Sequence, residues 1–261
     1  MQARLFQIDA FTSRHFSGNP AAVMVLDGYP EEAALQALAA ENNLSETAFI
    51  VAVDGDYRIR WFTPTVEVPL CGHATLASAA VVLERLEPGR DAVIFHSASG
   101  PLTVHLSERG FVMNFPVRAC SPATPPAGLS QALGIDLQEI LWDGFNFVAR
   151  LASAAEVRRL APDLAMIAQM PCAGVIVTAL GDEHYDCVSR YFAPAKGIPE
   201  DPVTGGAHCA LTPYWTERLA KTELHAFQAS ARGGELWCRL LGHRVELEGA
   251  CVFYLEGVAG W

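Results

Sequence analysis

A short phrase occurs twice in this chain, and its spacing constrains the fold more than any other feature of the sequence. Arg-Trp-Phe-Thr-Pro at residues 60–64 returns as Arg-Tyr-Phe-Ala-Pro at residues 190–194, which is 130 residues later in a chain of 261. Each copy is followed by a phrase with glycine and histidine that opens an apolar, helix-like run, at residues 71–77 and 205–211. A repeat at half the chain length predicts two similar domains, whose equivalent loops are expected to meet across a cleft.

Both halves are rich in strand-like segments, and each half contains one long apolar helix. Helical spacing predicts helices over 31–43 and 72–86 in the first half, and over 153–160 and 207–219 in the second. Most of the remaining apolar segments are short and separated by turn residues, which is typical of antiparallel strands. We therefore predict an α+β fold of two pseudo-symmetric domains, each a curved, mainly antiparallel sheet or barrel around a central helix.

The boundary between the halves is predicted in a proline-rich stretch. Residues 116–128 hold four prolines and few long apolar side chains, which is typical of a linker. We therefore expect an N-terminal domain at 1–117 and a C-terminal domain at 118–261. An alternative for the final strand is that it packs back on the N-terminal domain.

Composition and charge narrow the classes of function. Hydrophobic residues make up 51% of the chain and charged residues 18%, which is enough apolar material for two cores. The formal net charge of −11 argues against nucleic-acid binding, because such proteins present a basic face. No apolar run approaches the roughly 20 residues of a membrane span, and no signal peptide precedes the first strand-like segment. We expect a soluble, cytoplasmic protein.

The cysteines and histidines do not follow a metal-binding or disulfide pattern. Seven cysteines are scattered along the chain without a C-x-x-C pair, and the eight histidines form no H-E-x-x-H phrase. The sequence therefore predicts neither a disulfide framework nor a metal site.

Two glycine-rich junctions are candidates for substrate binding. Gly72 in the first half, and Gly205 with Gly206 in the second, stand where a loop enters a helix. Glycine allows a ligand to approach the backbone closely, and the free N–H groups of a helix start bind carboxylates well. The alternative is that these glycines only form tight turns.

Glu46 is the candidate general acid and base. It lies where a predicted helix hands over to the apolar strand 47–53, so that its carboxylate is expected to be partly desolvated. Desolvation raises the pKa of a carboxyl group and suits it to proton transfer near neutral pH. The alternative is a solvated glutamate at the end of a strand.

Three further side chains near these junctions could take part in chemistry. His73 follows Gly72 and is either a proton shuttle or a histidine bonded to the backbone. Asp201 precedes a proline and either holds a substrate hydroxyl or caps the following turn. Cys71 is either a base with a lowered pKa or an inert apolar filler. His208 is expected to be structural.

Taken together, these phrases resemble the phenazine-biosynthesis PhzF-like family over nearly the whole chain. Seven phrases occur in the family's order, at residues 11–12, 18–23, 44–49, 60–64, 67–68, 70–77 and 201–209. The resemblance implies the diaminopimelate-epimerase-like fold and a cofactor-independent isomerase, in a biosynthetic process similar to phenazine biosynthesis. It also implies a homodimer.

The resemblance implies roles for the candidate residues. Glu46 matches the glutamate that moves a proton on a cyclic carboxylic acid, His73 and Asp201 match residues that assist at the substrate, and the glycines match carboxylate-binding loops. Gly206 departs from the family, which commonly has serine there, and this departure leaves the substrate open.

Three functions are carried forward. The first is an isomerase that moves a proton on a small carboxylic acid, without metal or cofactor, through Glu46. The second is a two-base epimerase or racemase that uses Cys71, although the second half offers no convincing partner thiol. The third is a protein that binds a metabolite without turning it over.

Overall fold

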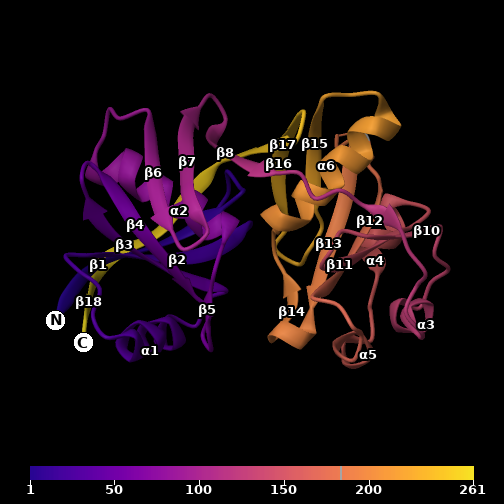
Figure 1. Ribbon diagram of the computed structural model, residues 1–261, viewed down its shortest axis with the longest axis horizontal. Coiled ribbons are helices and arrows are strands. Elements are labelled where there is room, and N and C mark those ends of the chain that lie inside the picture. The colour runs from indigo at the N-terminus through magenta and orange to yellow at the C-terminus, as the bar shows by residue number, and fades with distance from the viewer. Residues whose placement is uncertain (183) are drawn as a thin grey trace. The chain divides into compact units, whose positions relative to one another are not determined.

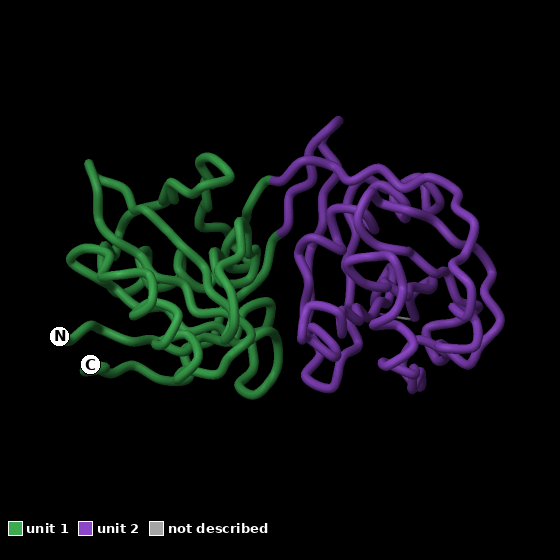
Figure 2. Tube along the Cα trace, turned by 60° about the horizontal axis from the view of Figure 1, so that its bottom comes forward, with its two compact units in different colours: residues 1–114, 248–261 green, residues 115–247 purple. Residues whose placement is uncertain are grey.

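The last strand of the chain returns to the first. In the computed structural model, which describes residues 1–182 and 184–261, β18 (Cys251–Gly260) pairs antiparallel along the whole of β1 (Gln2–Ala10). The chain consequently divides into one unit of residues 1–114 and 248–261, and a second unit of residues 115–247 (Figure 2). The junction at 114/115 lies close to the predicted 117/118. Pairing with β1 places the final strand in the first unit, which is the alternative that the sequence left open for this strand.

The first unit contains a long sheet in which antiparallel pairs alternate with parallel crossovers. Antiparallel pairing joins β18 to β1, β1 to β2, β3 to β4, β6 to β7 and β7 to β8, whereas β2 runs parallel to β3 and β4 runs parallel to β6. Its other elements are β2 (Asn19–Leu26), α1 (Glu32–Asn42), β3 (Glu46–Val53), β4 (Asp56–Phe62), β5 (Glu67–Val68), α2 (Gly72–Val81), the π-helical turn η1 (Val82–Leu86), β6 (Ala92–Ser97), β7 (Gly100–Ser107) and β8 (Gly110–Pro116).

The second unit repeats this order of strand directions. β11 runs parallel to β12, β12 pairs antiparallel with β13, β13 runs parallel to β15, and β15 pairs antiparallel with β16. Its elements are β9 (Ser121–Pro122), α3 (Leu129–Leu133), β10 (Glu139–Trp142), β11 (Asn146–Arg150), α4 (Ala154–Arg159), α5 (Leu164–Ala168), β12 (Gly174–Leu180), β13 (Cys187–Ala193), the 3-10 turn η2 (Pro194–Lys196), β14 (Ile198–Asp201), α6 (Gly205–Leu219), β15 (Glu223–Gln228), β16 (Gly234–Leu241) and β17 (Arg244–Gly249).

The repeated phrase occupies equivalent strands in the two units (Figure 1). Its first copy ends β4 and its second copy ends β13. Each strand pairs antiparallel with the strand before it and with the short strand after it, and parallel with a strand reached through the long helix. Each arginine also pairs with a later glutamate of its own unit, Arg60 with Glu67 and Arg190 with Glu200. The prediction of an α+β fold with a duplicated plan is confirmed.

One long helix lies at the core of each unit. α2 is buried along its length except at Gly72, and it packs against β1, β2, β3 and β18. α6 packs against β15 and β16. Both helices begin with glycine and continue with small residues, so that strands approach them closely. The predicted helix at 72–86 is correct in extent, but its last turn is π-helical rather than α-helical.

Candidate functional site

Four polar side chains of the first unit meet at the start of α2. Asn19 is the first residue of β2, Glu46 the first of β3, Cys71 the N-cap residue of α2, and His73 the second residue of that helix. The parallel register that sets Ala21 opposite Glu46 brings the starting ends of β2 and β3 together. The four residues are 0%, 9%, 7% and 5% exposed, in that order, which makes this a buried polar cluster beside an apolar helix.

His73 links the members of this cluster. Its Nδ1 lies 3.2 Å from the Asn19 side-chain nitrogen and 3.5 Å from the Cys71 sulfur, and its Nε2 lies 3.2 Å from Oε2 of Glu46. An amide nitrogen only donates hydrogen bonds, so Nδ1 has to accept from Asn19. The neutral imidazole therefore carries its proton on Nε2, facing the Glu46 carboxylate.

Burial keeps the imidazole of His73 neutral. Desolvation lowers the pKa of His73 from about 6.5 to about 3. A neutral imidazole does not stabilise the charged carboxylate beside it as an imidazolium would. This arrangement is suited to proton transfer by Glu46.

Three of these side chains, Glu46, Cys71 and His73, are of types that bind metal ions. Ligand atoms of Glu46, Cys71 and His73 lie within 4.8 Å of one another. However, the thiol faces Nδ1 of the imidazole and the carboxylate faces Nε2, so the two groups address different nitrogens of the ring. A histidine offers one nitrogen to an ion, so the two close contacts on opposite ring nitrogens are those of a polar cluster rather than of a closed ligand set.

The second unit places Asp201 in a hydrogen-bonded loop before α6. Asp201 ends β14 and is 9% exposed, and its Oδ2 accepts the hydroxyl of Thr204, the N-cap residue of α6. Gln228, the fully buried last residue of β15, hydrogen-bonds to the backbone of this loop. Its Oε1 accepts the Thr204 backbone N–H at 2.8 Å, and its Nε2 donates to the Asp201 carbonyl at 2.7 Å.

Gly205 and Gly206 form the first turn of α6, as predicted for a loop-to-helix junction. A Cβ atom at Gly206 would lie 3.3 Å from Nη1 of Arg118, which is closer than side chains usually pack. A side chain at this position would therefore displace the guanidinium by a few tenths of an ångström. His208 lies in the next position but one, and its Nδ1 is 2.9 Å from the Thr204 carbonyl, in the structural role expected for it.

These buried histidines predict a stability that declines in mild acid. Burial lowers the pKa of His208 to about 4 and that of His73 to about 3, so only the unfolded chain takes up protons just below pH 6.5. We expect the free energy of unfolding to fall by roughly 1–3 kcal/mol between about pH 7.5 and about pH 5.5, measured by urea denaturation. A double variant with glutamine in place of both histidines should lose less of its free energy of unfolding between these pH values. An equal loss would contradict the assignment of this pH dependence to His73 and His208.

The chain is similar to known proteins over nearly its whole length. The family model for phenazine biosynthesis-like proteins, PhzC-PhzF, matches residues 8–257. The chain belongs to this family. A PhzC-PhzF relative from Pseudomonas aeruginosa, named as an uncharacterized isomerase, is 49% identical over 257 residues, which is 98% of each chain. Identity at this level over the full length places the chain among the isomerases of the family.

Solved structures agree with this assignment. A PhzF-family protein from Enterococcus faecalis is 40% identical, is matched over 100% of each chain and has a TM-score of 0.96. A hydroxyproline epimerase from Agrobacterium vitis is 9% identical, with 98% of this chain and 92% of that chain covered and a TM-score of 0.64. The latter likeness concerns the fold alone, and it confirms the predicted diaminopimelate-epimerase-like architecture.

The structure brings some predicted residues together and adds others. Glu46 and His73 are neighbours, and Asp201 shares a loop with the α6 glycines. Asn19 was not predicted as a site residue; it lies in the family phrase 18–23 within a Gly-Asn-Pro run typical of a turn. Gln228 was not predicted either, because a lone glutamine at a strand end offers no signal. That the two groups of residues serve one substrate stays a prediction.

Within residues 1–182 and 184–261, no helix combines the length and the apolar character that crossing a membrane requires. The cytoplasmic location and the homodimer stay predictions.

Proposed function

We propose that this PhzC-PhzF family member moves a proton on a small carboxylic acid, cyclic acids included, with Glu46 as the general acid and base. The observation that supports this most directly is the buried Glu46 carboxylate, 3.2 Å from an imidazole that burial holds neutral. A carboxylate in such surroundings is a stronger base than one in water.

The proposed reaction needs only groups that this chain supplies. Ionised Glu46 takes a proton from an activated carbon of the acid, and the resulting carboxylic acid returns it at another position of the same molecule. Throughout, Nε2–H of His73 holds the orientation of the carboxyl group, while Asn19 fixes the tautomer from the other side of the ring. The substrate gains and loses one proton, so no oxidant or reductant takes part.

Isotope exchange tests this proposal. The wild-type protein is incubated in deuterated water with a panel of small cyclic and aromatic carboxylic acids, and deuterium incorporation is followed by mass spectrometry. Incorporation into at least one acid is expected. If acids bind but none exchanges, the protein is a metabolite binder rather than an enzyme.

A two-base epimerase is the second candidate, because the Cys71 sulfur lies 3.5 Å from His73 Nδ1 in the same buried cluster. A partner thiol is the weak point of this mechanism. Cys209 lies inside α6, where burial raises the pKa of its thiol to about 12, so it is a poor base near neutral pH.

Replacement of the thiol separates the two mechanisms. Cys71→Ser is expected to retain isotope exchange within about tenfold of wild type, since the hydroxyl keeps a small polar group beside Nδ1 of His73. Exchange rates of both proteins are compared on the same acid, with Cys238→Ser, which replaces another buried cysteine, as the control. A loss of about a hundredfold or more confined to the Cys71 variant would favour the two-base epimerase.

A further inference from the structure

Within the residues that the structure describes, the guanidinium of Arg118 has no hydrogen-bond acceptor or ion-pair partner, and it lies beside the predicted substrate-binding glycines. Its guanidinium lies within 3.3–3.7 Å of the place that a Gly206 side chain would occupy. Among residues 1–182 and 184–261, no carboxylate pairs with this guanidinium, whereas Arg60, Arg190 and Arg218 each bond to a glutamate. In a chain with a net charge of −11, the five N–H donors of this side chain thus meet no acceptor among the described residues.

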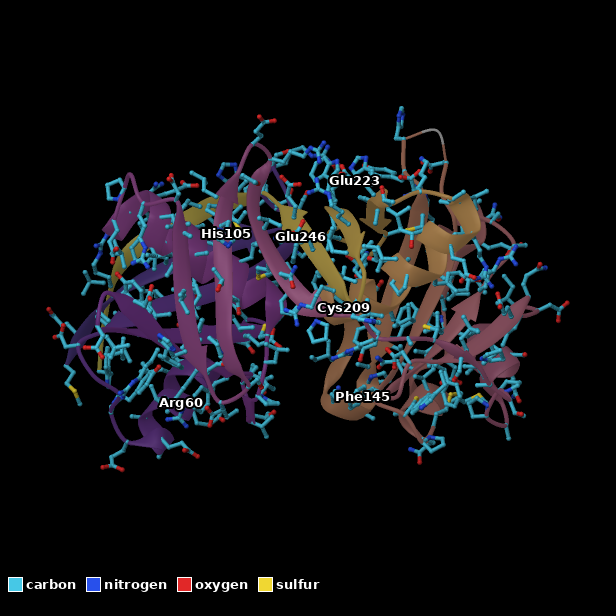
Figure 3. All side chains as sticks on the ribbon, turned by 45° about the horizontal axis from the view of Figure 1, so that its top comes forward. Arg60, His105, Phe145, Cys209, Glu223 and Glu246 are labelled. Atoms are coloured by element: carbon cyan, nitrogen blue, oxygen red, sulfur yellow. The ribbon has the colours of Figure 1, made fainter. Side chains whose placement is uncertain are left out.

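The fold holds Arg118 in this place from two sides. Pro213 lies inside α6 and lacks an N–H, which frees the carbonyl of Cys209 one turn earlier. That carbonyl accepts the backbone N–H of Arg118 at 3.1 Å. On the other side, the guanidinium carbon lies 5.0 Å from the ring centre of Phe145. Figure 3 labels both anchors, Cys209 on α6 and Phe145 in the turn between β10 and β11.

The acidic groups near Arg118 are already engaged. Asp143 and Asp201 act electrostatically on the buried Tyr191, as Arg118 does. Oδ1 of Asp143 accepts the backbone N–H groups of Phe145 and Asn146, and its Oδ2 accepts the Asn146 side-chain amide at 2.8 Å. Oδ2 of Asp201 accepts the Thr204 hydroxyl. The hydrogen bonds of the turn at residues 143–146 thus place Phe145 against the guanidinium and use both carboxylate oxygens of Asp143.

We propose that Arg118 is the specificity-determining residue of this enzyme and binds the carboxylate of the substrate beside Gly206. This proposal rests on the proposed function, because it takes the Gly205–Gly206 turn as part of the substrate site. A planar guanidinium matches a carboxylate with two parallel hydrogen bonds. Gly206 has no side chain, so the guanidinium reaches the position where the family commonly has a serine.

Binding of simple acids and their neutral amides tests Arg118 without requiring the physiological substrate. Calorimetric titrations compare benzoate with benzamide, and cyclohexanecarboxylate with its amide. The wild-type protein is expected to prefer each acid. Arg118→Gln should weaken the binding of the acids by about tenfold and leave the amides unchanged, because it removes charge-assisted hydrogen bonds. Arg118→Lys should lose less, since it keeps the charge without the planar pair of donors.

Two variants serve as controls for this test. Arg159→Gln removes the same charge from an exposed position of the same unit and should leave all affinities unchanged. Gly206→Ala adds a Cβ that displaces the guanidinium by a few tenths of an ångström and should weaken the acids by a smaller factor than Arg118→Gln. If Arg118→Gln keeps the wild-type preference, or if the wild-type protein has none, the proposal is wrong. Inorganic phosphate that competes more strongly than both acids would also overturn the assignment to a carboxylate.

The outcome is independent of turnover. A preference for acids that depends on Arg118, with no isotope exchange in the wild-type protein, would contradict the proposed function and leave the role of Arg118 in place. Isotope exchange with an acid preference that ignores Arg118 would contradict only the role of Arg118.

Discussion

Glu46→Gln is expected to lower the rate of isotope exchange by about a thousandfold, with the fold unchanged. The amide neither accepts a proton from carbon nor returns one, whereas its shape and its oxygen acceptor keep the contact with Nε2 of His73. Exchange is measured on the acid that the wild-type protein labels most rapidly. The free energy of unfolding of the variant should lie close to that of the wild type.

Glu41→Gln is the matched control for this experiment. Glu41 lies in the same unit on α1, exposed to solvent, so the same change of charge there should leave the exchange rate within about twofold of wild type. If the Glu46 variant exchanges within about tenfold of wild type, another group transfers the proton and the assignment of Glu46 is wrong.

Arg190→Met is expected to destabilise the second unit by about 3 kcal/mol, the second large effect. The Arg190 side chain is only 12% exposed. It makes two hydrogen bonds to Glu200, at 2.6 and 2.9 Å, and two more at the end of α4, to the carbonyls of Leu160 at 2.6 Å and Val157 at 3.3 Å. Its guanidinium also lies over the ring of Phe192. The substitution leaves a partly buried carboxylate and a carbonyl without their donor.

The first copy of the repeat supplies the control. Arg60 pairs with Glu67 and Glu32 in the same manner, but its side chain is 25% exposed and those of its partners are 36% and 72% exposed. Arg60→Met should therefore cost about 1 kcal/mol or less, because water replaces part of the lost pair. Hydrogen exchange of β4 and β13 amides reports on each unit separately. Equal losses in the two variants would contradict this account.

Most of the scaffold was predicted from local patterns in the sequence. The duplicated phrase predicted two units of the same plan, and it ends β4 and β13, which have equivalent neighbours. The long apolar helices were predicted close to their observed limits, since buried small residues at helical spacing are a local pattern. By contrast, the placement of residues 248–261 with the first unit depends on β1, at the other end of the chain, and no local pattern encodes it.

The candidate site divides in the same way. Glu46, His73, Asp201 and the glycines were identified because the phrases around them are distinctive. The tautomer of His73 depends on Asn19, which lies on a different strand. The loop of Asp201 depends on Gln228, at the end of β15. Such partners are distant in the sequence, and single polar residues leave no periodic signal.

Gly206 shows the difference most clearly. From the sequence, this glycine was a departure from the family that left the substrate open. In the structure, the missing side chain of Gly206 leaves room for the guanidinium of Arg118. The Cys209 carbonyl, which Pro213 leaves free, and the ring of Phe145 hold Arg118 in place. The sequence by itself determined the duplicated scaffold, the family and the candidate carboxylate, because these depend on contiguous patterns. Only the tertiary structure decided which distant side chains surround them, because hydrogen bonds and charge pairs form between residues that folding brings together.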